Sequence, residues 1–198
     1  MRFVSLTAVT LLVMSFCGCA VDQRIGLTYT PFLNAAGGRG ALQIERPDIA
    51  SVQKNEKGQY VIGTVTNALG AKIGDTVTND FPGDWLALAL KTELEGSGYR
   101  VILVEHLQGS STKALKVSVD RLWVDQVRTF ATNGAEAVLS LNITVMKYGR
   151  FVDLIPVSEK ATLRAYHGGT ARQKEQALQM AIQASMRQAV PKIIRSLE

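Results

Sequence analysis

The two histidines of this 198-residue chain are the residues best suited to catalysis or metal binding. His106 follows Glu105 at the end of an expected strand, and His167 precedes two glycines in an expected turn. Neither belongs to a His-x-x-x-His or His-x-x-Glu arrangement, and the sequence contains no Gly-x-Ser-x-Gly segment. Carboxylates are spread over expected strands and turns, as at Asp120, Asp125, Asp153 and Glu159. The sequence therefore predicts no catalytic residues, no metal site and no cofactor, and we expect a protein that is not an enzyme.

A glycine-rich segment and an excess of basic residues also lack the features of a specific binding motif. Residues 37–40 read Gly-Gly-Arg-Gly, without the Lys-Ser/Thr pair of a phosphate-binding loop, so a flexible loop is expected. The net charge is +5, but no aromatic-and-basic module accompanies it, and we expect no nucleic-acid partner. An exposed helix face is the favoured explanation of the carboxy-terminal basic residues, and an anionic envelope partner is the alternative. These residues are Arg172, Lys174, Arg187, Lys192 and Arg195.

The two cysteines, Cys17 and Cys19, lie at the end of an apolar amino-terminal segment. Residues 3–16 follow a positive start at Arg2 and are too few to span a bilayer comfortably, which is typical of a secretory signal. The rest of the chain contains no cysteine, so it can form neither a disulfide framework nor a cysteine-based metal site. The sequence predicts export from the cytoplasm.

The residues around Cys19 resemble the lipobox of bacterial lipoproteins. Gly18 stands at the cleavage position and Cys19 would become the first residue, whose sulfur receives a diacylglycerol. Phe16 replaces the usual Leu of a lipobox, and Cys17 replaces the usual Ala or Ser. An ordinary cleaved signal peptide is the alternative, but the avoidance of cysteine elsewhere favours lipidation at Cys19. Because Ala20 and not Asp follows, the resemblance implies the outer membrane, with the domain on its periplasmic face.

The expected organisation is a lipoprotein signal peptide at 1–18, a lipidated tether at 19–24 and a single α+β domain at 25–198. Within the domain, apolar alternation predicts strands and apolar residues at helical spacing predict helices. The strands are expected at 25–30, 42–45, 60–65, 99–104, 115–124, 137–145 and 151–166, and the helices at 85–95 and from 170 onward. Residues 66–83 contain three glycines and a proline and are expected to form a loop.

Local signals refine several of these boundaries. Asp84 is expected to cap the first helix, and the glycines at 96 and 98 to end it. A change of apolar phase predicts a bulge near Asp120 and Arg121. Pro156 is expected to interrupt the last strand, and Pro191 to kink or interrupt the last helix.

The last three expected strands are joined by short connections typical of an antiparallel meander. Asn133-Gly134 and Tyr148-Gly149 lie at these joints. The sequence therefore predicts an α+β fold with a mainly antiparallel sheet and two helices packed on one face. Trp85 and Trp123 are expected to lie in or at the rim of the core.

The leader, the helix at 84–95 running into Gly98-Tyr99-Arg100-Val101, and the strand at 115–124 together resemble the YajG family of small bacterial lipoproteins. In that family a lipidated cysteine precedes strands, a helix with a Gly-aromatic end, a long meander and a final helix. The resemblance implies a location in the cell envelope and supplies no catalytic residues. The same order is also similar to lipoprotein accessory subunits of envelope transport systems.

Residues 151–157 are apolar on both faces of their expected strand. Burial of both faces is favoured, and the alternative is that Leu154 and Ile155 form a surface for an envelope protein partner. We therefore expect a lipoprotein held to the membrane by its amino-terminal lipid and acting by binding or assembly. The alternative function is an accessory subunit of an envelope transport or secretion complex. A hydrolase would require polar residues converging in a pocket.

Overall fold

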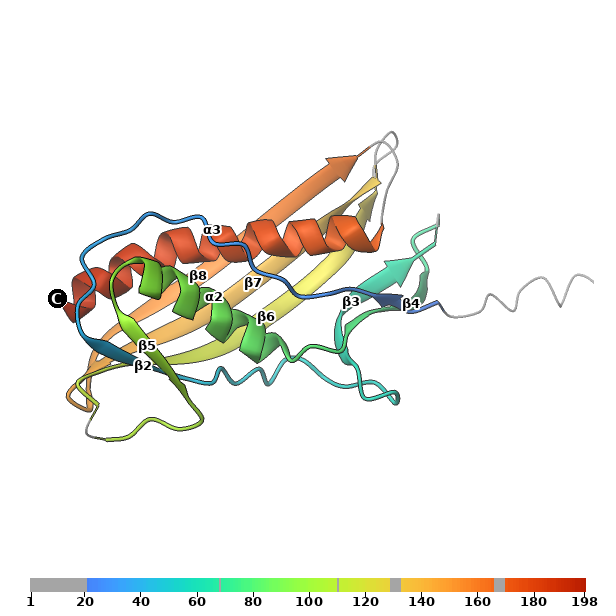
Figure 1. The fold of residues 1–198 in the computed structure, drawn as a ribbon. Coiled ribbons are helices and arrows are strands. Elements are labelled where there is room, and N and C mark those ends of the chain that lie inside the picture. The colour runs from blue at the N-terminus through green and yellow to red at the C-terminus, as the bar shows by residue number, and fades with distance from the viewer. Residues whose placement is uncertain (1–20, 68, 110, 129–132, 166–169) are drawn as a thin grey trace, which may run out of the picture.

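The computed structural model describes residues 21–67, 69–109, 111–128, 133–165 and 170–198 (Figure 1). The expected signal peptide, with Cys17, Gly18 and Cys19, lies outside the described residues, as does His167. The described residues form eight strands and two helices. In chain order these are β1 Gln23–Arg24, β2 Ala41–Glu45, β3 Tyr60–Thr66, β4 Lys72–Thr78, α2 Pro82–Gly96, β5 Arg100–Val104, β6 Lys113–Arg128, β7 Asn133–Lys147, β8 Arg150–Ala165 and α3 Ala171–Leu197. Within these ranges, neither helix has the length and apolar character needed to cross a membrane.

All eight strands belong to one mixed sheet, so the prediction of a mainly antiparallel sheet is wrong. Four of the seven strand pairings are parallel: β1 with β4, β2 with β5, β2 with β6, and β3 with β6. The other three, β3 with β4, β6 with β7 and β7 with β8, are antiparallel. The physical reason is the length of β6, which lets two short strands from earlier in the chain join one of its edges. Apolar alternation identifies a strand but not its partner or direction, so this arrangement was not visible in the sequence.

The expected antiparallel meander forms as β6, β7 and β8. The bulge expected near Asp120 is confirmed, since the register shifts between Val119 and Arg121. Pro156 does not interrupt β8, which runs unbroken and places Pro156 opposite Asn142. Among the described strands β8 pairs with β7 alone, and an edge strand tolerates a residue without a backbone N–H.

Both helices cover the same face of the sheet, with α3 lying along the meander and α2 over β2 and β5 (Figure 1). The expected helix start at Thr170 is confirmed: its hydroxyl accepts a hydrogen bond from the Gln173 backbone, and the Gln173 side chain accepts one from the Thr170 backbone. The helix then continues through Pro191 to Leu197 without the expected interruption. Its apolar face is buried against β7, whose Leu139, Leu141 and Ile143 are at most 1% exposed. This contact is the centre of the core.

Helix α2 begins earlier than the sequence indicated. Phe81 is its N-cap and Pro82 its first residue, so Asp84 lies in the first turn and not at the cap. The expected end is confirmed, with Gly98 at φ +108° just beyond the helix. A Cβ on Gly98 would overlap the carbonyl of Gly38, and one on Gly38 would overlap the ring of Tyr99. The glycine-rich segment is therefore packed against the end of α2 and does not have the expected character of a free loop.

The amino-terminal part of the domain differs most from expectation. Residues 25–30 form no strand; they cross the helices, where the side-chain amides of Gln179 and Gln183 donate to the Thr30 carbonyl at 3.3 and 3.0 Å. The segment expected to be a loop at 66–83 contains β4. Gln23 and Arg24, within the range assigned to the tether, pair with β4 as β1.

Candidate functional site

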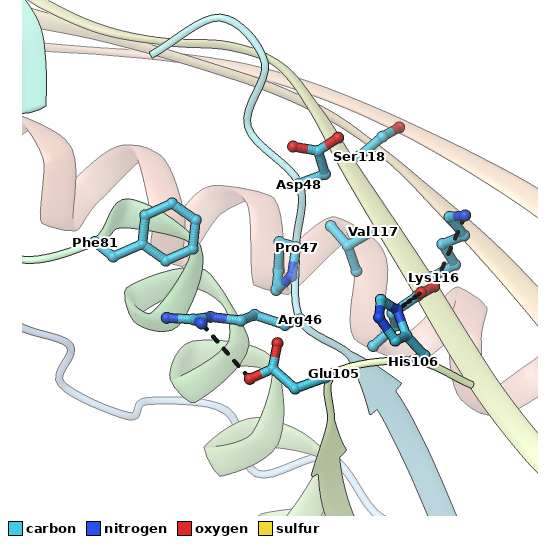
Figure 2. Close-up of a pocket in the computed structure, with 10 residues that line it drawn as sticks. Arg46, Pro47, Asp48, Phe81, Glu105, His106, Lys116, Val117 and Ser118 are labelled. Carbon is cyan, nitrogen blue, oxygen red and sulfur yellow. Dashed lines mark ion pairs between the residues drawn. The ribbon is translucent and has the colours of Figure 1, made fainter. Parts of the chain in front are cut away.

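The candidate site is a charged groove of about 550 Å³ at the end of β2 and β5 (Figure 2). Because β2 and β5 are parallel, their carboxyl ends meet at the same side of the sheet, where β6 passes beside them. Phe81, the N-cap of α2, closes one side. The groove is lined by Glu45, Arg46, Pro47, Asp48, Phe81, Glu105, His106, Lys116, Val117 and Ser118.

Arg46 is held in place on one side of the groove. Its Nε and Nη2 donate to the two carboxylate oxygens of Asp84 at 2.7 and 2.8 Å, and its guanidinium lies 4.8 Å from the centre of the Phe81 ring. Nη1 lies 3.5 Å from Glu105 (Figure 2). The hydrogen bonds to Asp84 raise the pKa of Arg46 above its ordinary value. Asp84, expected to be a helix cap, therefore orients an arginine at the groove.

On the other side of the groove, Glu45 lies near two basic side chains, His106 and Lys116. Its carboxylate lies 3.7 Å from His106 Nδ1 and 3.8 Å from Lys116 Nζ, distances that permit electrostatic attraction but not a hydrogen bond. The His106 side chain is 92% exposed, so water surrounds it. The group that the structure places nearest its imidazole in the groove is the Glu45 carboxylate. The arrangement offers charged groups of both signs to a polar ligand.

The carboxylates singled out in the sequence do not converge. Asp125 accepts hydrogen bonds from the Thr64 backbone and hydroxyl, Asp120 accepts one from Asn142, and Asp153 accepts one from Ser196. Across the ranges that the structure describes, no three or more His, Cys, Asp or Glu side chains are grouped so that they could hold a metal ion.

The expected apolar surface on β8 is divided between two faces. Leu154 is 50% exposed, whereas Ile155 is 2% exposed and packs in the core. Phe151 and Val152 are exposed by 65% and 41%, so the favoured burial of both faces is wrong. Trp85 lies in the core as expected, 4% exposed, with its indole N–H donating to the Thr28 carbonyl at 2.8 Å.

Sequence reasoning missed two buried charges. Lys174, expected on a solvent-exposed face, is completely buried; its ammonium donates to the Thr64 carbonyl at 2.8 Å and to the Thr76 hydroxyl. Burial lowers the pKa of Lys174 to about 8, and the nearby Asp125 opposes this shift. The signal was available, because Lys174 lies four residues before Leu178 on the buried stripe of α3.

The second buried charge, Glu93 of α2, is 2% exposed. Its carboxylate accepts from the Tyr29 hydroxyl and from the backbone N–H groups of Phe32 and Leu33 at 3.0 and 3.1 Å. Burial, together with the hydrogen bond to Glu93, raises the pKa of Tyr29. Both charged groups are hydrogen-bonded to other parts of the fold, and neither lines the groove. Lys174 links α3 to β3, and Glu93 links α2 to the segment at Phe32 and Leu33.

Neither a protein-family model nor a curated protein matches the chain. Among solved structures, the fold is similar to protein XCC0632 of Xanthomonas campestris, described as a DUF330 protein, with a TM-score of 0.54 and 17% identity over 87% of this chain and 97% of that one. It is also similar to the hypothetical protein CT253 of Chlamydia trachomatis, with a TM-score of 0.50 and 9% identity over 81% and 98% of the two chains. Lipoprotein GNA1162 of Neisseria meningitidis has a TM-score of 0.37 and 11% identity over 77% and 99%. The first two likenesses show a shared fold, and the third is too weak to carry an argument.

Proposed function

We propose that this chain is a lipid-anchored lipoprotein of the bacterial cell envelope, whose domain faces the periplasm from the outer membrane and acts by binding or assembly. The observation that carries the proposal is the Gly18-Cys19 pair at the end of an apolar leader. Cys19 comes two residues before Val21, whose backbone N–H donates to the Ile73 carbonyl at 3.1 Å. A lipid on Cys19 would thus be attached almost directly to the folded domain.

The chemistry of the domain supports binding over catalysis. The groove places Arg46 against Asp84 and Glu105, and Glu45 near Lys116, so its charged groups largely compensate one another. A groove of this kind can recognise a polar ligand but supplies no activated nucleophile. The order of elements also supports a relationship with YajG-like lipoproteins, which belongs to the same proposal.

Substitution of the two leader cysteines tests the anchor. Cys19→Ser removes the sulfur that would carry the acyl chains, so the protein should incorporate no labelled palmitate and should leave the membrane fraction. Cys17→Ser is the matched control and should sediment with membranes as the parent does. Equal labelling and equal sedimentation of the Cys19→Ser variant and the parent would refute the proposal.

A second function, that of an accessory subunit in an envelope transport or secretion complex, is favoured by the exposed edge at β8. This edge presents Phe151, Val152 and Leu154, and among the described strands it pairs only with β7. A photo-crosslinker at Leu154 should give a discrete product in intact cells, and one at Lys160, farther along β8, should not. Identical patterns at the two positions would count against this function.

A further inference from the structure

Three exposed apolar side chains lie at the place where the chain enters the domain. Val21 is 60% exposed, Leu69 93% and Ile73 36%, and together they are called the anchor-side patch. Leu69 lies in the turn between β3 and β4, and Ile73 lies in β4 itself. Figure 1 shows this hairpin beside β1, close to the first of the described residues. Several exposed apolar side chains at one end of a sheet are a feature of surfaces that contact a membrane or a protein.

The start of the domain is fixed firmly to this hairpin. In addition to the bond between Val21 and Ile73, the Asp22 carboxylate accepts from the Asp75 backbone at 3.2 Å. A Cβ on Gly74 would overlap the Val21 carbonyl, so the two segments approach as closely as a glycine allows. Asp22 also pairs with Lys57 at 2.8 Å, and this hydrogen bond lowers the pKa of Asp22. Val21 therefore cannot move far from β4 while the sheet is intact.

The length of chain between Cys19 and the patch limits how far the domain can stand from a lipid attached there. Two residues span at most about 7 Å when fully extended. The polar layer on each side of a bilayer is about 5–8 Å thick. With the acyl chains of Cys19 in the hydrocarbon, the segment is too short to carry Val21 well beyond the headgroups.

The turn presents Leu69 outward in a defined position. The Asn67 side-chain oxygen accepts from the backbone N–H groups of Leu69 and Ala71 at 2.9 and 3.0 Å, which fixes the turn. Two lysines flank the patch, with the Lys57 and Lys72 side chains 70% and 59% exposed. Each pairs with one aspartate, and an ammonium has three N–H donors, so donors remain for lipid phosphates.

From these observations we infer that the anchor-side patch lies in the headgroup layer of the membrane, with Leu69 inserted toward the acyl chains. The inference deepens the proposed function and depends on lipidation at Cys19. It adds an orientation: the β3–β4 hairpin faces the bilayer, and the end of the meander where β7 meets β8 faces away from it. In Figure 1 these regions lie at opposite ends of the molecule.

A fluorescent label at Leu69 tests the orientation. Leu69→Cys is made in the full chain, expressed with its own leader, labelled with a polarity-sensitive fluorophore and reconstituted in phosphatidylethanolamine–phosphatidylglycerol vesicles. Its emission should shift to the blue and be lost on adding a bilayer-borne quencher. Leu103→Cys is the matched control, because Leu103 is 45% exposed on β5, at the other end of the molecule. The control emission should be the same with and without vesicles.

The outcomes separate the orientation from the anchor. If the vesicles carry the protein but the Leu69 label remains as water-exposed as the Leu103 label, the orientation is wrong and the anchor stands. If the labelled protein does not sediment with vesicles and Cys19 itself takes up fluorophore, the anchor fails and the orientation fails with it. A blue shift at Leu69 without vesicles, increasing with protein concentration, would assign the patch to a second copy of the chain and overturn the inference.

Discussion

The meander with α3 and the amino-terminal region before it are stabilised in different ways. In β7 every second side chain along the strand, including Leu139, Leu141 and Ile143, faces the apolar stripe of α3. The region from β1 to β5 is instead fastened at separate points, such as the carboxylate of Glu93 and the close approach of Gly38 to Tyr99. Both regions contribute to one apolar core, which includes Leu42, Leu90 and Val101 of the amino-terminal region. The amino-terminal region differs because it also depends on individual groups that have no substitute nearby.

The two regions meet at a small polar seam. Lys174 of α3 donates to Thr64 of β3, and Thr64 in turn donates to Asp125 of β6 from its backbone and its hydroxyl. Beside them Gly63 lies so close to β6 that a Cβ would overlap the Val124 carbonyl. The seam shows that specific polar contacts, in addition to buried apolar side chains such as Ile62, join β3 to the meander.

The largest expected effect is in the meander. Leu141→Ala removes a side chain that is 1% exposed in the centre of the core, and we expect the free energy of unfolding to fall by about 2–5 kcal/mol. Thr144→Ala, on the opposite face of β7, should cost less than about 1 kcal/mol. Denaturant titration measures both values. Similar losses for the two variants would mean that the apolar stripe does not dominate this region.

The second largest effect concerns Lys174 in the polar seam, which should make the free energy of unfolding depend on pH. Lys174 has a pKa of about 8 in the folded chain and an ordinary value of 10.5, so between these values the unfolded chain binds more protons. The free energy of unfolding should therefore rise with pH, by about 2–3 kcal/mol between pH 8 and 10. Burial raises the pKa of Tyr29 and Tyr99 above the ordinary 10.0, so their contribution to stability begins to fall near pH 10 and opposes the rise only at the upper end of this range.

Lys174→Met supplies the control for this rise, because it keeps an unbranched apolar stem without a titrating group. The free energy of unfolding, measured by denaturant titration at several pH values, should rise less in this variant than in the parent. Parallel pH profiles for the two proteins would show that Lys174 is equally protonated in both states, contrary to the expectation.

Features set by neighbouring residues could be predicted from the sequence, whereas pairings between distant segments could not. The bulge at Asp120, the helix start at Thr170 and the helix end at Gly98 depend on neighbouring residues, and all three are confirmed. The parallel pairings and β4 depend on which distant segment lies alongside, and nothing local to residues 72–78 indicates that. Long-range pairing of this kind determines the strand order of the whole sheet.

The same distinction holds for the functional residues, of which some could be predicted from the sequence and others could not. Cys19 was found because a signal and its cleavage position are contiguous in the sequence, and it stays a prediction outside the described residues. The groove was not found, because Arg46, Asp84 and Glu105 come from three elements that only the fold brings together. His106 stands out by its residue type, and the structure places it 3.7 Å from Glu45 with its side chain exposed to water. Glu93 and Lys174 show that a charged residue on the apolar stripe of a helix can be buried with hydrogen-bond partners of its own.

The smallest of the three expected changes in the free energy of unfolding is at Glu93. It distinguishes the two regions best, because it should act directly on the amino-terminal region alone. Glu93→Gln keeps the shape but leaves one acceptor oxygen where the carboxylate serves the backbone of Phe32 and Leu33 and the hydroxyl of Tyr29. The NH₂ group of glutamine is a hydrogen-bond donor and cannot accept from these N–H and O–H groups. We therefore expect the free energy of unfolding to fall by about 1–3 kcal/mol. Glu95→Gln, at an exposed pair with Lys91, should cost less than about 1 kcal/mol.

Amide hydrogen exchange locates the change caused by Glu93→Gln. Exchange at Phe32 and Leu33 should accelerate, because their acceptor is weakened, while amides in β7 should be affected only through the smaller global stability. Leu141→Ala should accelerate exchange across β7, whose amides exchange through global unfolding. If Glu93→Gln changed both regions equally, the amino-terminal region would open only together with the meander, and the two would form one cooperative unit.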